Sequence, residues 1–388
     1  MTRLQSEKRT SYSTKVKMGK FRKIFGWNSL KYVFGTILLS SLSLSYLSPF
    51  IHPNTAGFVP FFGLAFPLLI VLNILFFAVA LFKRSKWAIL SGIALIIGLF
   101  YYSRIIAFGN EDTPYNKEQF KVLSYNVRLF DLYNPNASNS QINRKSIIQH
   151  LKKINADIMC FQEFYHQDAP TNFPTRDSIM KALNAKFIHE RYVYKSSGHQ
   201  NFGVCLISKY PLIEKGNVIF DNAGSTDNFC IYADAVIGTD TVRFYNVHLQ
   251  SIHLQKDDYA LFGENEPEAS DQSSSWFRLI QKVKQAFPIR ANQALKIREH
   301  INTSPYPVVV CGDFNDTPMS YTYSQFNNTL TDAFRNCGKG LGSTYAGKIP
   351  AGRIDYIFHS EDIGSLNFHI QDSRYSDHYS ISCNMFKK

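Results

Sequence analysis

The most informative stretch of the sequence is Val308–Asn315, where a short run of β-branched residues ends in polar ones. The three valines and Cys311 predict a buried strand, and Gly312 interrupts it just before Asp313 and Asn315. Because side chains alternate along an extended chain, Asp313 and Asn315 are expected on one face. A carboxylate beside an amide can hold a water molecule and bind a phosphoryl oxygen, as a metal-assisted phosphate hydrolase requires. Gly-Asp-x-Asn is equally typical of a turn, so this stretch alone leaves both interpretations open.

Other predicted strands between residues 120 and 388 also end in polar side chains. They are Asn126, Glu163, His248, Asp355 and the pair Asp377 and His378. One such strand end carries little information, but six of them in one region are hard to explain as surface decoration. Oxygen-rich ligands suit a hard cation such as Mg²⁺ or Mn²⁺. No Cys-x-x-Cys pair occurs among the six cysteines, which argues against a zinc site.

Short strand-like and helix-like segments alternate from Phe120 to the C-terminus. A hairpin is expected around Gly238-Thr239-Asp240, and a long helix at about 276–303. Further strands are expected at 122–126, 157–162, 203–208, 308–313, 354–358 and 379–385. Adjacent strands, hairpins and few helices predict an α/β protein with mixed sheets rather than a parallel βαβ array.

Six short motifs contain the polar residues at the strand ends. In chain order they are Ser124-Tyr125-Asn126-Val127, Phe161-Gln162-Glu163, Asn246-Val247-His248-Leu249, Gly312-Asp313-Phe314-Asn315, Arg353-Ile354-Asp355-Tyr356-Ile357 and Ser376-Asp377-His378-Tyr379. Together they resemble the motifs of the endonuclease/exonuclease/phosphatase family, which includes DNase I-like nucleases, apurinic endonucleases, neutral sphingomyelinases and inositol polyphosphate 5-phosphatases. The resemblance covers 120–388 and implies a four-layer α/β/β/α sandwich of two mixed sheets that cleaves phosphoester bonds with a metal ion.

The resemblance also implies a role for each residue of the motifs. Glu163 would be the principal ligand of Mg²⁺, or of Mn²⁺ in its place, with Asn126 beside it and Asp377 near the metal. Asp313 would orient or deprotonate the attacking water, and Asn315 would bind the scissile phosphate.

The same resemblance assigns the two histidines. His378 would donate to a phosphoryl oxygen as negative charge builds, while Asp355 would orient His378 and favour its protonated form. His248 resembles the second histidine of the DNase I, sphingomyelinase and phosphatase branches, which binds the phosphate or assists the leaving group. Arg128 stands where some members carry a second carboxylate, so we expect one metal ion. Three other arginines could contact phosphate, although solvated arginines are commoner: Arg290, Arg353 and Arg374.

The first 113 residues differ sharply from the rest of the chain. They contain 13 Lys and Arg against 3 Asp and Glu, whereas the remaining residues contain 29 against 27. The basic excess of the chain therefore lies outside the part that resembles a phosphoesterase. It gives that part no strong electrostatic footprint for nucleic acid.

Long apolar runs interrupt this basic N-terminal region. No Lys, Arg, Asp or Glu occurs from Tyr32 to Phe82, and Arg104 is the only one from Trp87 to Phe108. We predict a membrane region at 31–109 with three spans, at about 31–50, 58–82 and 87–108. The third run is alternatively a helix lying on the membrane surface. A polar linker at 110–119 and the catalytic domain at 120–388 would follow.

Basic residues predict the orientation in the membrane. The segment 1–30 and the loop Lys83–Lys86 are both basic, so both are expected on the cytoplasmic side. With three spans the catalytic domain lies on the opposite face, which in a bacterial inner membrane is periplasmic or extracellular. The chain is thus expected to be an integral membrane protein that contacts the lipid bilayer through its N-terminal helices.

The sequence therefore predicts a membrane-anchored, metal-dependent phosphoesterase in which activated water attacks phosphorus in line. The substrate would be a nucleic acid or a phospholipid-like molecule. A hydrophobic rim around the site would favour lipid, and Lys or Arg spaced along a groove would favour nucleic acid. The alternative is a catalytically silent membrane scaffold that retains the fold.

Overall fold

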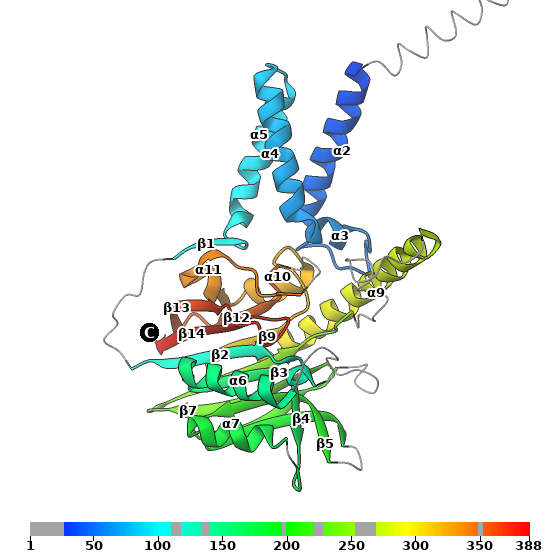
Figure 1. Cartoon of the computed structure of the whole chain (residues 1–388). Coiled ribbons are helices and arrows are strands. Elements are labelled where there is room, and N and C mark those ends of the chain that lie inside the picture. Colours follow the sequence, from blue (N-terminus) through cyan, green and yellow to red (C-terminus); the bar gives the residue numbers. More distant parts are fainter. Residues whose placement is uncertain are drawn as a thin grey trace, which may run out of the picture. The chain divides into compact units, whose positions relative to one another are not determined.

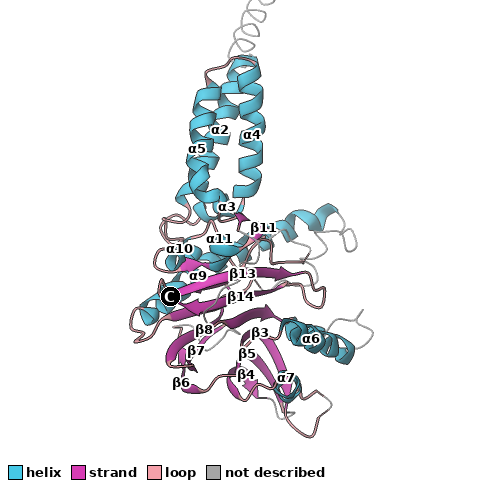
Figure 2. Cartoon of the chain, turned by 90° about the vertical axis from the view of Figure 1, so that its left-hand side faces the viewer, coloured by secondary structure: helices cyan, strands magenta, loops and turns pink. Residues whose placement is uncertain are grey.

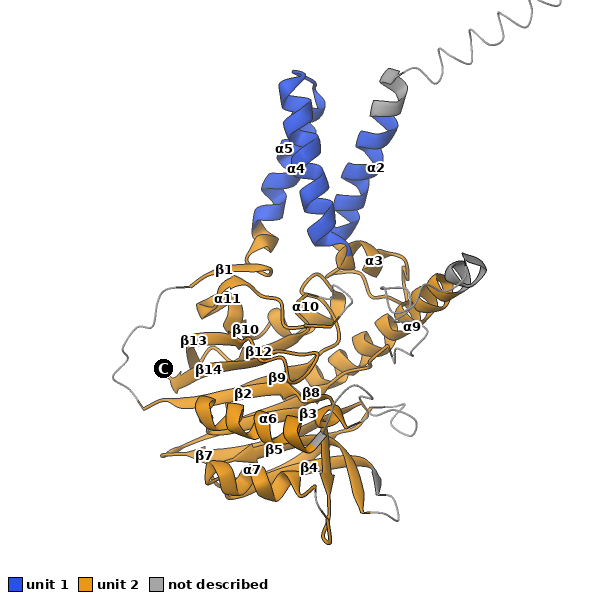
Figure 3. Cartoon of the chain, in the orientation of Figure 1, with its two compact units in different colours: residues 1–46, 65–99 blue, residues 47–64, 100–388 orange. Residues whose placement is uncertain are grey.

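The computed structural model describes residues 27–109, 118–132, 140–171, 173–195, 199–220, 228–252, 269–347 and 352–388. Most of the basic segment predicted at 1–30 and of the linker predicted at 110–119 lies outside these residues. The chain forms two compact units (Figure 3). One contains Met1–Tyr46 and Ala65–Leu99, and the other contains Leu47–Leu64 and Phe100–Lys388. Because the second contains the domain predicted to be catalytic, we call it the catalytic unit, and we call its segment Leu47–Leu64 the connector.

The first unit is built mainly from three helices with aromatic contacts between them. They are α2 (Trp27–Leu47), α4 (Phe66–Phe82) and α5 (Trp87–Tyr102). The ring of Phe76 in α4 lies 5.9 Å from that of Phe34 in α2 and 6.0 Å from that of Trp87 in α5. The Tyr46 hydroxyl donates to the Ala94 carbonyl over 2.9 Å. A second cross-helix hydrogen bond runs from the Asn73 side-chain amide of α4 to the Leu38 carbonyl of α2 over 3.5 Å, so aromatic packing and hydrogen bonds join the three helices.

These helices differ from the three predicted membrane spans. The run at 58–82 is divided into α3 (Val59–Leu64) and α4, because Pro67 suits the first turn of a helix and not the interior of a continuous one. The run at 87–108 ends its helix at Tyr102 and continues into strand β1 (Ile106–Phe108). Among the described residues, no helix combines the length and the apolar character needed to cross a membrane. The structure thus does not contain the predicted spans.

The catalytic unit contains two six-stranded mixed sheets (Figure 1). The first sheet has the order β13-β14-β2-β3-β5-β4, formed by Ile363–Gln371, Ser380–Lys387, Phe120–Asn126, Ile158–Gln167, Gln200–Ser208 and Phe187–Lys195. The second has the order β10-β12-β9-β8-β7-β6, formed by Thr331–Asp332, Asp355–His359, Val308–Asp313, Asp240–His248, Phe229–Ile237 and Leu212–Val218. Only β2–β3 and β8–β9 are parallel pairs within these described sheets. The predicted mixed α/β class is confirmed.

Three apolar cores hold the layers of this unit together. One lies between the sheets and includes Val122, Ile231 and Val309. The second joins the first sheet to α6 (Ser140–Ile154) and α7 (Thr175–Leu183), and the third joins the second sheet to α9 (Ala269–Ile301) and α10 (Tyr321–Asn327). Figure 2 shows these helices outside the strands. Strand β9, in which every residue is buried, accordingly begins with the apolar run Val308–Cys311.

The connector belongs to the catalytic unit although it precedes the motifs by many residues. The Ser324 hydroxyl in α10 donates to the Pro49 carbonyl over 2.6 Å, and the Phe61 ring stands edge-on to Phe287 of α9 at 5.3 Å. Arg104 is also buried here and donates to the Pro318 carbonyl over 3.0 Å. The catalytic unit therefore begins well before the boundary at residue 120 that the motifs indicate.

Candidate active site

Three adjacent strands of the second sheet bring polar residues to one edge. Asp313 ends β9 and is paired in register with His248, which ends the parallel strand β8. Asp355 begins the antiparallel strand β12 and is also paired with Asp313. At Gly312 the backbone has φ +153°, and a Cβ there would overlap the Val247 carbonyl. Glycine is required because β8 and β9 approach so closely just before the site.

The ends of the first sheet meet this edge. Asn126 ends β2, and its side-chain amide donates to Asp313 Oδ2 over 3.0 Å and to Glu163 Oε1 over 3.2 Å. The Ser376 hydroxyl donates to the Asn126 carbonyl over 2.8 Å, which ties the segment before β14 to the same place. The structure therefore brings residues of both sheets into one hydrogen-bonded cluster.

His378 and Asp355 form a buried pair beside Asp313. His378 Nδ1 lies 2.9 Å from Asp355 Oδ2, and His378 Nε2 lies 3.7 Å from Asp313 Oδ2. Burial lowers the pKa of His378, but the carboxylates of Asp355 and Asp313 outweigh it, so the pKa lies well above its usual value. Burial raises the pKa of Asp355 to about 6, although His378 opposes this. The pair is therefore an imidazolium and a carboxylate at neutral pH, and the Tyr345 ring covers His378 at 5.1 Å.

Glu163 is displaced from the regular strand by a bulge. The register of β3 against β5 shifts between Phe161 and Phe164, and Glu163 has φ +48°. A bulge re-aims a side chain, and left-handed backbone at a non-glycine residue is retained only where the surroundings enforce it. Its side chain is 35% exposed, whereas that of Asp313 is 1% exposed. The bulge thus presents one carboxylate at the open side of the cluster.

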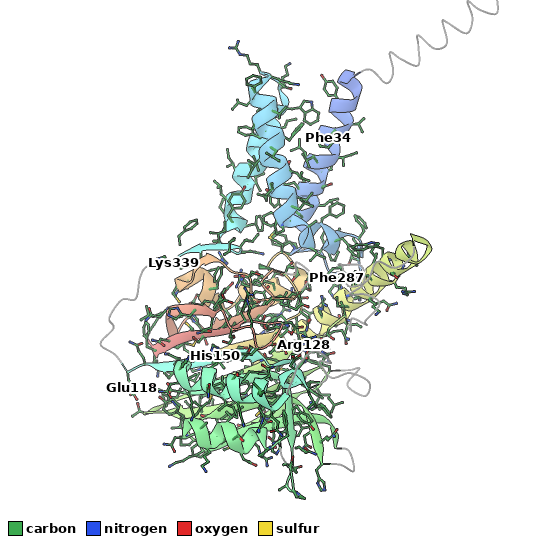
Figure 4. The ribbon with its side chains drawn as sticks, viewed as in Figure 1. Phe34, Glu118, Arg128, His150, Phe287 and Lys339 are labelled. Carbon is green, nitrogen blue, oxygen red and sulfur yellow. The ribbon has the colours of Figure 1, made fainter. Side chains whose placement is uncertain are left out.

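Asp377 contacts the turn that follows β2. Arg128 to Asp131 have four consecutive positive φ angles, from +45° to +60°. Each such angle is costly outside glycine, but Phe130 in this turn is fully buried and packs 5.5 Å from Phe164. The turn places Arg128, labelled in Figure 4, with its Nε 3.6 Å from Asp377 Oδ2. Arg128 therefore places a guanidinium beside Asp377, where some members of the family carry a second carboxylate.

Asn315 also has left-handed backbone, with φ +53°. Its backbone N–H donates to Asp313 Oδ1 over 2.8 Å, and its side-chain amide donates to the Leu249 carbonyl over 3.1 Å. Asn315 thus orients the Asp313 carboxylate and is close enough to the site to meet a phosphate.

His248 has a buried ring nitrogen that makes no hydrogen bond to the described residues. Its Nε2 atom lies 3.9 Å from both Glu163 Oε1 and Asp313 Oδ2, and the residue is 4% exposed. A buried polar atom without a partner is costly, and 3.9 Å is too long for a direct hydrogen bond. A ligand oxygen between these side chains would satisfy His248.

The donor set suits a hard divalent cation. Glu163 and Asp377 offer carboxylates that are partly exposed, and the amide oxygen of the buried Asn126 accepts from the Arg128 N–H over 3.0 Å. Carboxylate and amide oxygens are the ligands that such cations prefer. Atoms of Asp313, Asp355 and His378 also lie within 4.8 Å of one another. A metal ion is disfavoured among Asp313, Asp355 and His378, because His378 is itself cationic and its Nδ1 is already hydrogen-bonded to Asp355. Glu163 is therefore the carboxylate beside Asn126 that is most accessible to a metal ion.

Sequence reasoning missed several residues that position the site. Gln162 donates to Asn246 Oδ1 over 2.7 Å, a buried link between the two sheets beside the bulge. The Thr344 hydroxyl accepts from the Asp355 N–H over 3.1 Å. The only signal in the sequence was a polar residue inside an apolar strand, at Gln162 and Asn246. Arg353 does not reach a phosphate site, because it is buried and paired with Asp332 at 2.8 Å.

The family model described as Endonuclease/Exonuclease/phosphatase family matches residues 123–378. The chain belongs to this family. All the motif residues that converge in the site lie within the matched range. A second model, for a domain of unknown function, matches residues 22–105. No curated protein matches the chain.

Solved structures to which this chain is similar include members of the same family. An endonuclease/exonuclease/phosphatase from Bacteroides vulgatus has 18% identity and a TM-score of 0.50, and the match covers 70% of this chain and 100% of that one. A family protein from Bacteroides thetaiotaomicron has 17% identity and a TM-score of 0.48 over 71% of this chain and 100% of that one. The human Nocturnin catalytic domain has 16% identity and a TM-score of 0.49 over 70% and 95%. The Bacteroides vulgatus structure supports the DNase I-like fold.

Proposed function

We propose that this protein is a metal-dependent phosphoesterase that hydrolyses a phosphodiester or phosphomonoester bond with activated water. The observation that carries the proposal is the unpartnered Nε2 of His248, which lies 3.9 Å from both Glu163 Oε1 and Asp313 Oδ2. The cationic His378 approaches the same Asp313 Oδ2 atom with its Nε2 at 3.7 Å. Two hydrogen-bond donors and two carboxylates around one small space are what a phosphoryl group and an attacking water require.

The residues of the chain divide the chemical work between them. Asp313, oriented by Asn126 and Asn315, accepts a proton from the attacking water. His378, held protonated by Asp355, donates to a non-bridging oxygen of phosphorus as negative charge builds.

His248 and the open side of the site serve the leaving group and the metal. His248 Nε2 hydrogen-bonds the leaving oxygen or the phosphate. Glu163, Asn126 and Asp377 would hold Mg²⁺, with Mn²⁺ as the alternative. When bound, the ion supplies positive charge to the phosphoryl oxygens and stabilises the transition state.

The decisive experiment is turnover by the purified whole chain in mild detergent with Mg²⁺. Supercoiled DNA, single-stranded RNA, sphingomyelin, phosphoinositides and a chromogenic phosphodiester would be tested in parallel, with EDTA and Asp313→Asn as controls. Metal-dependent turnover of one class, lost in both controls, supports the proposal and identifies the substrate as nucleic acid or lipid head group. A folded protein without turnover on any of them favours the catalytically silent scaffold.

We also propose that lipid covers the N-terminal unit. Its described helices carry large apolar side chains on the outside: Val33, Phe34, Ile37, Leu68, Val71, Leu75, Val79, Phe82, Ile89, Ile93, Ile96 and Leu99. Contiguous exposed apolar surface of this extent indicates an interaction site, and acyl chains are the occupant that a stretch without charge from Tyr32 to Phe82 favours. Sedimentation with membranes after alkaline extraction tests this. A protein that stays in solution without detergent, as a monomer or as a dimer, would overturn it.

The side of the membrane on which the catalytic unit lies stays a prediction from the basic residues. The connector and the catalytic unit must share one side, because they pack together. Reporter fusions at residues 57, 85 and 115 are expected to report outside, inside and outside in a bacterium. A cytoplasmic signal at 115 would contradict the periplasmic or extracellular placement.

A further inference from the structure

Two side chains of α9 form hydrogen bonds with the segment that follows strand β8 of the proposed active site. The backbone N–H of Gln250 donates to Gln293 Oε1 over 2.9 Å, and the Gln250 carbonyl accepts from Arg290 Nε over 2.6 Å. Arg290 and Gln293 are three residues apart, so they lie on one face of the helix. All three residues are buried, at 4% to 7% exposure. Both backbone polar groups of Gln250, the N–H and the carbonyl, are therefore fixed by α9.

This segment, Leu249–Gln250, is bonded to the residues that carry the proposed catalytic side chains. Leu249 follows His248, and its backbone N–H donates to the Asp313 carbonyl over 3.0 Å. Its own carbonyl accepts from the Asn315 side chain over 3.1 Å. A shift of Leu249 and Gln250 would therefore move His248 and release Asn315 together.

Arg290 brings a positive charge into this buried region. Burial lowers the pKa of Arg290, and the carboxylates of Asp316 and Asp313 oppose that effect. Burying a guanidinium is costly unless it is paired, and a neutral donor would have sufficed to hold one carbonyl. The buried carboxylate of Asp316 is the main partner that offsets the cost of burying this guanidinium, and Asp313 contributes less.

We propose that Arg290 is a positioning residue of this enzyme, which fixes the Leu249–Gln250 segment and thereby sets His248 and Asn315 around Asp313. The proposal rests on the proposed phosphoesterase function. Gln293 holds the N–H of the same residue, Gln250, and on this proposal neither side chain touches substrate. Misplacing catalytic groups by about 1 Å costs a factor on the order of a hundred in rate, which sets the size of the expected effect.

The test compares Arg290→Met, Arg290→Lys and Gln293→Leu with the whole wild-type chain. Arg278→Met is the matched control, because Arg278 is an exposed arginine of the same helix. For Arg290→Met we expect kcat to fall about a hundredfold with KM changed less than about threefold, because the contact is not made to substrate. Arg290→Lys retains the charge and one donor, so its kcat should lie between that of the wild type and that of Arg290→Met. Gln293→Leu should lose about tenfold in kcat, because it removes one of the two contacts.

The outcomes separate this proposal from the proposed function itself. A wild-type chain without turnover on any substrate class overturns both. An active wild type with an Arg290→Met variant whose kcat stays within about twofold overturns the positioning role alone. A rise in KM at unchanged kcat also overturns it, since that result assigns Arg290 to substrate binding. Where Arg290→Met has no cooperative melting transition, Arg290→Lys and Gln293→Leu are judged by the same kcat criterion.

Discussion

The two sides of the active site are built differently. On one side Asp313, Asp355 and His378 have side chains that are 1%, 2% and 6% exposed and are hydrogen-bonded to one another or to neighbouring strands. On the other side Glu163, Asp377 and Arg128 have side chains that are 35%, 19% and 44% exposed. Electrostatic interactions are stronger where water is excluded, so the buried side holds fixed charges before substrate arrives. The side chains on the open side are accessible to solvent, so they can exchange water for a metal ion.

Asp313→Asn should have the largest effect, because it removes the proton acceptor from the buried side. The amide keeps the shape of the side chain, and we expect kcat to fall by about 10²- to 10⁴-fold with little change in the melting temperature. Steady-state kinetics with a thermal melt checks this. Activity close to that of the wild type would remove Asp313 from the role of base and weaken the contrast between the two sides.

Glu163→Gln should act through the metal. We expect the Mg²⁺ concentration for half-maximal activity to rise about 10- to 100-fold, with much of the rate recovered at high Mg²⁺, because the open side can be refilled. A metal titration of the variant and of the wild type measures this. Should saturating Mg²⁺ restore nothing, Glu163 would belong functionally with the buried side.

Asp355→Asn should change the pH dependence. In the wild type the raised pKa of His378 keeps its proton as the pH rises through neutrality. Without Asp355 the remaining effect of burial lowers that pKa, so the alkaline loss of activity should begin at lower pH. The wild type should also lose activity as the pH falls through the Asp355 pKa of about 6, and this acid limb should weaken in the variant. An unchanged pH–rate profile for kcat would show that the pair does not set the protonation of His378.

Arg128→Ala should have the smallest effect. Arg128 is half-exposed, and its Nε lies 3.6 Å from Asp377 Oδ2, a separation typical of weak surface ion pairs. We expect the free energy of unfolding to change by less than about 1 kcal/mol, measured by urea denaturation. Arg128→Lys serves as the control that keeps the charge. A loss of activity comparable to that of Glu163→Gln would place Arg128 among the residues that bind substrate.

The sequence was sufficient to predict that the strand ends converge, because each buried strand is an apolar run that is bounded by polar residues. Asp313, His248 and Asp355 meet as expected, since adjacent strands of a sheet bring their ends to one edge. The bulge at Glu163 and the left-handed turn from Arg128 could not be predicted. Both put non-glycine residues at positive φ, which tertiary packing enforces and local propensity disfavours.

The sequence indicated neither the burial of Arg290 nor the division of the apolar run at 58–82 into two helices, for related reasons. Arg290 looks like a solvated helix residue until Gln250 and Asp316 are placed beside it. The apolar run at 58–82 has the composition of one span, yet its first part packs on Phe287 in the catalytic unit. In each case the outcome depends on a partner distant in the sequence, which hydropathy does not register.

The connector also bears on the order in which the chain can assemble. Pro49 and Ser324, which share a hydrogen bond, are separated by 275 residues. At about 5–20 residues per second of synthesis, the connector leaves the ribosome roughly 15–55 s before α10 exists. The catalytic unit thus completes itself around one of its earliest-made parts. Phe61 and Phe287 are 226 residues apart, so at the same rate Phe61 has no partner from α9 for roughly 11–45 s. Chaperones that bind nascent apolar segments have their longest opportunity there.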